Sequence, residues 1–182
     1  LKNISFENIK ADALDVDFGK LNFFNINCTN IKNDCLDISG AYVEGQKFIT
    51  KNVFDKSISV GENSNVSISD INISDSNIAL TVKDGSKAFF KDLHLEKNKF
   101  DIALFNKKNE FLRPSLKLEN INFLNNRKIL QSKNTELIID DTKLIGNYSN
   151  DFINNKIYWY NLIMENRLEK KFVYEQGDFS FQ

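Results

Sequence analysis

The chain has 182 residues, with 24 basic and 25 acidic side chains and a formal charge of −1 at neutral pH. This near balance excludes the basic surface that neutralises nucleic-acid phosphates, and the length suits one domain with a continuous core. The sequence has no run of about eighteen apolar residues and no charged-then-apolar leader, so we expect no membrane span and find no signal peptide.

Glycine and proline are scarce, whereas asparagine and aspartate are abundant. Seven glycines and one proline are few for an all-β protein built from hairpins, because hairpin turns depend on these residues. A fixed repeat period between 20 and 50 residues would instead indicate a solenoid.

Such a repeat is present, with a step of 22 residues. Two apolar columns keep this step over five successive copies, and the side chains of each column are expected to stack inside the protein. The first column is Leu14, Leu36, Ile58, Leu80 and Ile102, and the second is Val16, Ile38, Val60, Val82 and Leu104.

A second apolar pattern has residues at a start position and then two, five and seven positions later. Strong copies start at Ile4, Leu21, Val66, Ala88 and Leu116, and weaker copies start at Val43 and Leu137. The step of three requires a one-residue corner between two strands, and asparagine and aspartate tolerate the left-handed backbone that a corner needs. The corner positions are Asn8, Asn25, Lys47, Asp70, Asp92, Asn120 and Asp141.

The segments VSISDINI and LKLENINF illustrate this corner, and on them the chain resembles the right-handed parallel β-helix repeat family of pectate-lyase-like proteins. DALDVDF, NDCLDISG, SISVGE and ALTVKDGS look like successive coils of uncharacterised bacterial β-helix proteins. The resemblance implies an all-β parallel β-helix of about seven coils, with three short strands per coil and a C-terminal cap. The Gly-His-Gly turn of polygalacturonases and the arginine of pectate lyases are not found.

The ends of the repeat and one insertion can be placed as well. FNKKNEFLRP adds about six residues to one coil, contains Pro114 and is expected to form a lateral loop. The coils are expected over residues 1–146 and an aromatic-rich capping segment over 147–182, since solenoids need an atypical terminal unit. Leu1 enters within a coil, so we expect an upstream domain of the same protein.

Outward positions next to the first column carry carboxylates, with Asp15 beside Asp37 and Asp12 beside Asp34. Neighbouring strands lie about 4.8 Å apart, so such carboxylates repel, bind a cation or are screened by water on an open face. The same stripe continues through Ser59, Thr81 and Ala103 and includes Lys83. Three alternatives remain: a solvated face, a sugar-binding or catalytic groove using Asp15, Asp37 and Lys83, and a calcium site formed by Asp12, Asp15, Asp17, Asp34 and Asp37.

The two cysteines and the single histidine give no catalytic centre. Cys28 and Cys35 match no zinc spacing, so we expect Cys28 to be a small buried hydrophobe and expect no structural disulfide. His94 lies between two core positions and is expected to point outward, which makes a His-based nucleophilic triad hard to build.

The favoured function is a non-catalytic extracellular or cell-surface module, part of a larger bacterial protein, that presents a side surface to a polysaccharide or protein partner. One alternative is a lyase or glycoside hydrolase acting on acidic glycans, with paired carboxylates as its chemistry. The other is a trimeric subunit of a phage or surface fibre. Calcium is the one cofactor that the acidic stripe suggests.

Overall fold

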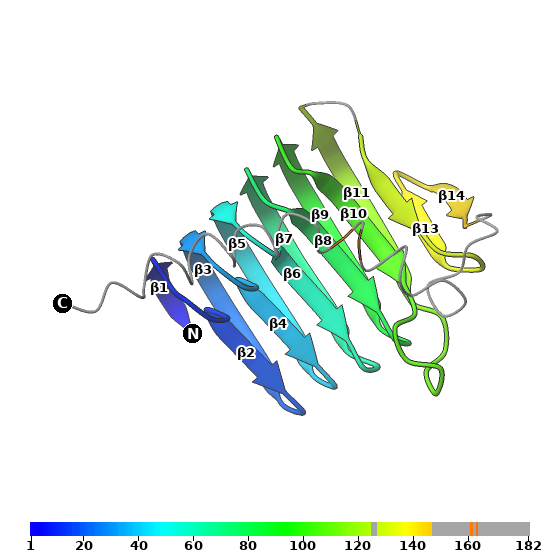
Figure 1. Ribbon diagram of the computed structural model, residues 1–182, viewed down its shortest axis with the longest axis horizontal. Coiled ribbons are helices and arrows are strands. Elements are labelled where there is room, and N and C mark those ends of the chain that lie inside the picture. Colours follow the sequence, from blue (N-terminus) through cyan, green and yellow to red (C-terminus); the bar gives the residue numbers. More distant parts are fainter. Residues whose placement is uncertain (125–126, 147–160, 162, 164–182) are drawn as a thin grey trace.

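The computed structural model describes residues 1–124, 127–146, 161 and 163. The chain alternates between two sheets and forms a parallel β-solenoid of about six turns (Figure 1). Sheet A contains β1 (Lys2–Glu7), β3 (Lys20–Ile31), β5 (Tyr42–Val53), β7 (Asn65–Ser74), β9 (Lys87–Glu96), β11 (Ser115–Phe123), β13 (Glu136–Ile139) and β14 (Thr142–Ile145). Sheet B contains β2 (Leu14–Asp17), β4 (Leu36–Ser39), β6 (Lys56–Gly61), β8 (Ile78–Lys83), β10 (Phe100–Phe105) and β12 (Ile129–Gln131).

The two apolar columns of the 22-residue repeat are confirmed in sheet B. Ile58 pairs with Leu36 on one side and with Leu80 on the other, and its side chain is fully buried. The first column extends to Ile129 and the second ends at Gln131. The core is therefore one stack of side chains between the two sheets.

Two sets of stacked corner residues, called corner ladders below, lie along sheet A, where the repeat predicted one; the first lies within the strands, and the second lies near their C-terminal ends or directly after them. Residues of the first ladder have φ between 54° and 63°, and they are Asn3, Asn25, Lys47, Asp70, Asp92 and Asn120. A second ladder has φ between 53° and 58° and contains Asn8, Asn30, Asn52, Asp75 and Lys97. Because Ile4 pairs with Ile26, the predicted alignment of Ile4 with Leu21 was wrong, and Asn8 belongs to the second ladder.

The last predicted copy is a hairpin and not a coil. β13 and β14 pair antiparallel, and the turn between them places Asp140 at φ 43° and Asp141 at φ 67°. Two consecutive positive φ angles are the signature of a type I′ hairpin turn, so the aspartate at this position has a different role from the corner residues.

The prediction that the cysteines form no structural disulfide was wrong. Cys28 is a buried residue of a core column, as predicted, but it is bonded to Cys35, with the Cα atoms 6.1 Å apart. The second corner at Asn30 turns the chain between the two cysteines and directs both side chains inward. Both sulfur atoms are therefore shielded from solvent.

The insertion is a lateral loop over residues 106–114, as predicted, and the Asn106 amide donates to the carbonyl oxygens of Phe111 and Leu112 at 2.8 and 3.0 Å. The predicted cap over 147–182 lies outside the described residues except for Asn161 and Ile163. Within the described part of the chain, no helix has the length and apolar character needed to cross a membrane.

Candidate functional site

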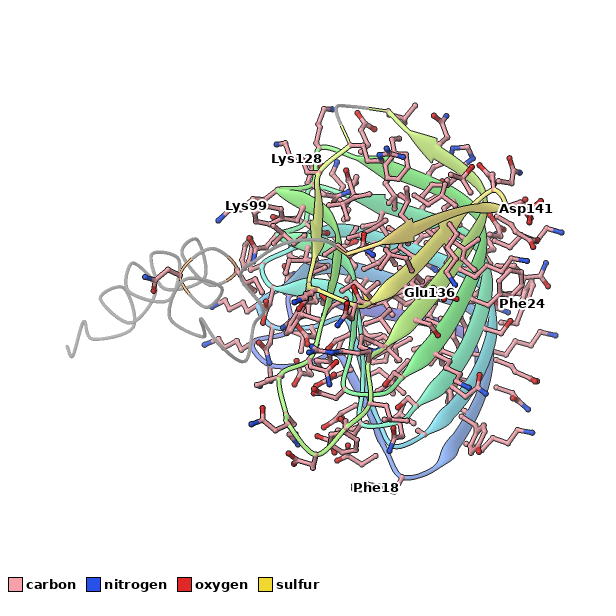
Figure 2. All side chains as sticks on the ribbon, turned by 90° about the vertical axis from the view of Figure 1, so that its right-hand side faces the viewer. Phe18, Phe24, Lys99, Lys128, Glu136 and Asp141 are labelled. Carbon is pink, nitrogen blue, oxygen red and sulfur yellow. A yellow bond between two sulfur atoms is a disulfide. The ribbon has the colours of Figure 1, made fainter. Side chains whose placement is uncertain are left out.

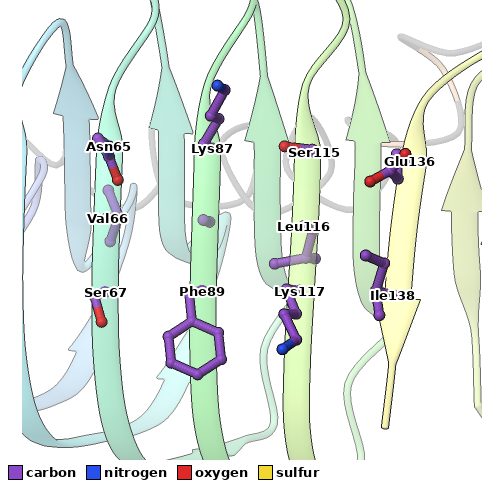
Figure 3. A pocket seen from close by; sticks show the side chains of 11 residues that line it. Asn65, Val66, Ser67, Lys87, Phe89, Ser115, Leu116, Lys117, Glu136 and Ile138 are labelled. Atoms are coloured by element: carbon purple, nitrogen blue, oxygen red, sulfur yellow. The ribbon is translucent and has the colours of Figure 1, made fainter. Parts of the chain in front are cut away.

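The outer face of sheet A carries a groove of about 260 Å³ across β7, β9, β11 and β13 (Figure 3). Its floor is the sheet itself, and alternate residues of each strand point outward into it. The outward residues that line it are Asn65, Ser67, Lys87, Phe89, Ser115, Lys117, Glu136 and Ile138.

Phe89 on β9 is the one aromatic side chain among the described residues that line this groove. Ser67 on β7 and Lys117 on β11 are its register partners, and Lys87 and Lys91 lie two residues before and after it on β9. Figure 3 shows the ring broadside, with its face towards the viewer and Lys117 beside it. An aromatic face is thus framed by a hydroxyl and by lysine side chains.

The charges around Phe89 are partly paired. The Lys117 ammonium lies 5.6 Å from the ring centroid and 2.7 Å from the Glu119 carboxylate, whose hydrogen bond raises the lysine pKa. Glu136 pairs with Lys143 at the far end of the groove. The groove therefore combines an apolar ring with both donors and acceptors of hydrogen bonds.

Further aromatic side chains lie on the same outer face, towards the N-terminal coils. Tyr42 is 65% exposed and Phe24 is 41% exposed, and Figure 2 shows Phe24 on the outer side of sheet A. Tyr42 is the register partner of Asn65, which lines the groove. Rows of outward side chains on successive strands repeat about every 4.8 Å, so the aromatic residues are distributed along the solenoid axis.

Sheet B presents a different arrangement, in which carboxylates join successive coils. Asp12 Oδ1 accepts a hydrogen bond from the backbone N–H of Asp34 at 2.8 Å, and Asp34 Oδ1 accepts one from that of Lys56 at 3.0 Å. The Lys56 ammonium lies 2.7 Å from Asp55 Oδ2, 3.2 Å from Asp34 Oδ1 and 3.4 Å from Asp34 Oδ2. Asp34 and Asp55 are 3% and 0% exposed, so this group of charges is shielded from water.

Burial raises the pKa of Asp34 to about 7, although the Lys56 ammonium opposes this shift. Burial alone would lower the pKa of Lys56, but the nearby Asp34 and Asp55 carboxylates outweigh it and hold that pKa above its ordinary value. The two shifts agree if Lys56 is charged and pairs chiefly with Asp55, at the shorter distance, while Asp34 gains or loses its proton near neutral pH.

Lys83 reaches back across one coil. Its side chain passes over Gly61, where a Cβ atom would come within 2.8 Å of the lysine Cε, and its ammonium donates to Ser59 Oγ at 3.0 Å. Burial and the charge of Lys56 lower the pKa of Lys83, while Asp37 and Asp34 oppose the shift. Glycine at position 61 therefore leaves the space that brings Lys83 towards Asp37.

Asp15 and Asp37 are register partners, as predicted, and Asp37 pairs on its other side with Ser59. Burial, Asp17 and Asp37 raise the pKa of Asp15. The expectation that this row is solvated was wrong beyond Asp37, because Ser59 and Thr81 are 0% exposed and Ala103 is buried. Ile163 packs with Ile78, Ala103 and Phe105, and its carbonyl oxygen accepts from the Asn77 amide at 2.7 Å.

The five aspartates proposed for calcium do not form one ligand set. In residues 1–124, 127–146, 161 and 163, no group of three or more acidic, histidine or cysteine side chains is arranged to hold a metal ion. Asp34 already binds Lys56, and the Asp12 carboxylate accepts a backbone N–H. The calcium site stays a prediction, and this geometry gives it no support.

The groove on sheet A was missed in the sequence. Lys87, Phe89 and Lys91 alternate with core residues of β9, so their outward orientation was readable from the apolar pattern. Their neighbours on β11 follow 28 positions later because of the lateral loop, and this irregular step hides the pairing of Phe89 with Lys117. His94 is exposed, as predicted.

Comparisons with protein-family models, with curated proteins and with solved structures gave no match to this chain.

Proposed function

We propose that this chain is a non-catalytic binding module whose side surface, the outer face of sheet A, binds an extended polysaccharide. The observation that carries the proposal is the groove around Phe89, where an aromatic face lies among serine, asparagine and lysine side chains. Sugars present an apolar C–H face and a rim of hydroxyls, so an aromatic ring with flanking hydrogen-bonding groups complements them.

The distribution of aromatic side chains supports a long ligand. Phe24, Tyr42 and Phe89 lie on β3, β5 and β9 of one continuous face. A polymer running along the solenoid axis would contact several coils at once, and binding at successive places raises the overall affinity without new contacts at any one place. Each single place on this open face can then bind the polymer weakly without making the overall affinity low.

The finer architecture belongs to the same proposal. We propose a right-handed parallel β-helix with three strands per coil, similar to pectate-lyase-like proteins. The corners support it: β3, for example, has positive φ at Asn25 and Asn30, and the corner at Asn25 separates the apolar pair before it from the apolar pair after it. A module of a larger protein in the cell envelope or outside the cell would suit the Cys28–Cys35 disulfide, because such bonds persist in oxidising compartments.

A catalytic alternative has one observation in its favour, which is the approach of Lys83 to the acidic stripe. Lys83 bonds to Ser59, the register partner of Asp37, so the lysine and this carboxylate lie closer than strands two coils apart imply. A lysine with a lowered pKa suits a general base. Ser59 is nevertheless 0% exposed, which leaves no room for a sugar ring at the Lys83 ammonium.

The proposal is tested by affinity electrophoresis and calorimetry of the purified chain against linear neutral and acidic polysaccharides. Phe89→Ala is expected to weaken binding at least tenfold, since it removes the apolar platform. The matched control is Leu112→Ala, which truncates an 82% exposed apolar side chain on the lateral loop. The proposal is wrong if no polysaccharide binds, or if both variants bind as the unaltered chain does.

Catalysis is tested in the same preparations. We expect no release of reducing ends or unsaturated products from pectin, alginate or chondroitin. Product release that disappears in Asp37→Ala would place the enzyme alternative first.

A further inference from the structure

The group formed by Asp34, Asp55 and Lys56 has no role in the proposed binding face. Lys56 begins β6, Asp55 precedes it, and Asp34 lies one coil below, where its carboxyl oxygen accepts the Lys56 backbone N–H. From this geometry we propose that Lys56 and Asp34 form an intramolecular amide bond between neighbouring coils, with Asp55 as the proton acceptor.

The distances suit attack of the lysine nitrogen on the Asp34 carboxyl carbon. Lys56 Nζ lies 3.2 Å and 3.4 Å from the two Asp34 oxygens, so it is in contact with both and faces the carboxyl carbon between them. Attack on that carbon then needs a small shift of the nitrogen out of the carboxyl plane and no movement of either strand. Lys56 is held by its own backbone hydrogen bond to Asp34, which fixes both partners before reaction.

The protonation states suit the reaction as well. The raised pKa of Asp34, about 7, keeps a substantial share of this group as the neutral carboxylic acid near neutral pH, and the acid is a far better acceptor of a nucleophile than a carboxylate. Asp55 Oδ2 lies 2.7 Å from the Lys56 ammonium and is placed to remove its proton. This pairing holds the pKa of Lys56 high, so the neutral amine forms only when Asp55 takes the proton.

The chemistry balances without any further reactant. The Lys56 ammonium gives one proton to Asp55, and the neutral amine forms a bond from Nζ to the Asp34 carbon. The tetrahedral intermediate transfers a second nitrogen proton to one Asp34 oxygen, the bond from carbon to that oxygen breaks, and one water leaves. The products are an amide, a water and a protonated Asp55, and the total charge is zero before and after.

The surroundings favour the condensed product. Asp34 and Asp55 are almost fully buried, and Lys56 has 12% of its side chain exposed, so little water is present to reverse the reaction. Bond formation also removes buried charges, whose desolvation is costly. The product would tie β6 to the residue that precedes Cys35, so an interstrand amide would adjoin the disulfide.

The test is intact mass spectrometry of the full chain after complete reduction of the disulfide. We expect a mass lower by one water than the sequence gives, and a branched peptide joining the segments that contain Asp34 and Lys56. Asp34→Asn is expected to lose one ammonia instead of one water, because its side-chain amide carries a different leaving group. Lys56→Met and Asp55→Asn are each expected to have the full mass of their sequences.

The branched peptide separates the proposal from other losses of water, such as ring closure at Asp84, which precedes Gly85. Full mass of the reduced, unaltered chain overturns the proposal, and so does a water loss that maps outside Asp34 and Lys56. The mass of the unaltered chain alone decides whether the amide bond forms, so the test does not depend on any variant being able to fold. Circular dichroism of each variant then shows whether its mass refers to a folded protein.

Discussion

The disulfide between Cys28 and Cys35 crosses the interior of one coil. The next coil carries Thr50 and Ser57 at the two equivalent positions. Thr50 is the register partner of Cys28, and its hydroxyl donates to Ser57 Oγ at 2.9 Å. Cys35 and Ser57 each precede a paired core residue, Leu36 and Ile58. The same cross-connection is thus covalent in one coil and a hydrogen bond in the next.

This relationship predicts an order of stability. The double substitution Cys28→Ala with Cys35→Ala removes a link that closes a loop of seven residues, and it should cost roughly 2–3 kcal/mol of unfolding free energy. Cys28→Thr with Cys35→Ser copies the next coil and should recover about 1 kcal/mol through its hydrogen bond. Urea unfolding under identical conditions measures both, and equal stability of the two variants would contradict the prediction.

Substitution of the core column should be severe. Ile58→Asp places a carboxylate between Leu36 and Leu80 in a fully buried position, at a cost of several kcal/mol. Ser67→Asp is the matched control, because Ser67 points outward from sheet A and is exposed. Thermal unfolding should show a large loss for the first variant and a small one for the second; the reverse order would invert the assignment of inner and outer faces.

The second corner ladder can be tested at Asn30, whose φ is 57°. Its side chain donates to Asn8 at 3.0 Å and accepts from Asn52 at 2.7 Å. Asn30→Gly keeps the backbone conformation and loses only these hydrogen bonds, whereas Asn30→Ala also incurs about 1–2 kcal/mol of backbone strain. Denaturant unfolding should therefore rank alanine below glycine, and an equal rank would mean that the corner does not need a left-handed residue.

Lys83 should make stability depend on pH in the alkaline range. Burial lowers its pKa in the folded state from the ordinary value of 10.5. Between the lowered pKa and 10.5 the unfolded chain binds more protons, so the unfolding free energy contributed by this group rises with pH. The difference between the unaltered chain and Lys83→Met should shift in that direction from pH 8 to 10.5, and a constant difference would argue against a desolvated lysine.

The repeat was readable from the sequence because inward side chains on stacked coils must be apolar at every step, as in the column through Ile58. The predicted register of the first coil was wrong because Ile4 matches Leu21 and Ile26 equally well in chemical character. Only the strand pairing shows that Ile26 is its partner. The disulfide was missed because Cys28 and Cys35 meet only after the turn at Asn30, which belongs to a ladder that the repeat did not show.

The candidate sites were less predictable for a related reason. The register of Asp15 with Asp37 follows from the 22-residue step. The contact of Ser59 with Lys83 depends on the space that Gly61 leaves, and the meeting of Phe89 with Lys117 depends on the length of the lateral loop. Neither is a property of the repeat itself.

The asparagine ladders give the solenoid a direction that its backbone pairing lacks. Each amide nitrogen donates to the residue of the preceding coil: Asn25 to Asn3, Asn30 to Asn8, and Asn120 to Asp92. An ionised aspartate can accept from the coil that follows it but cannot donate to the coil before it. A coil added on the C-terminal side of an asparagine corner therefore continues the hydrogen-bonded row if it brings asparagine, whereas an ionised aspartate, as at Asp75 after Asn52, cannot donate to the corner before it and can only accept from the next coil. The stack can thus be extended by a rule that distinguishes its two ends.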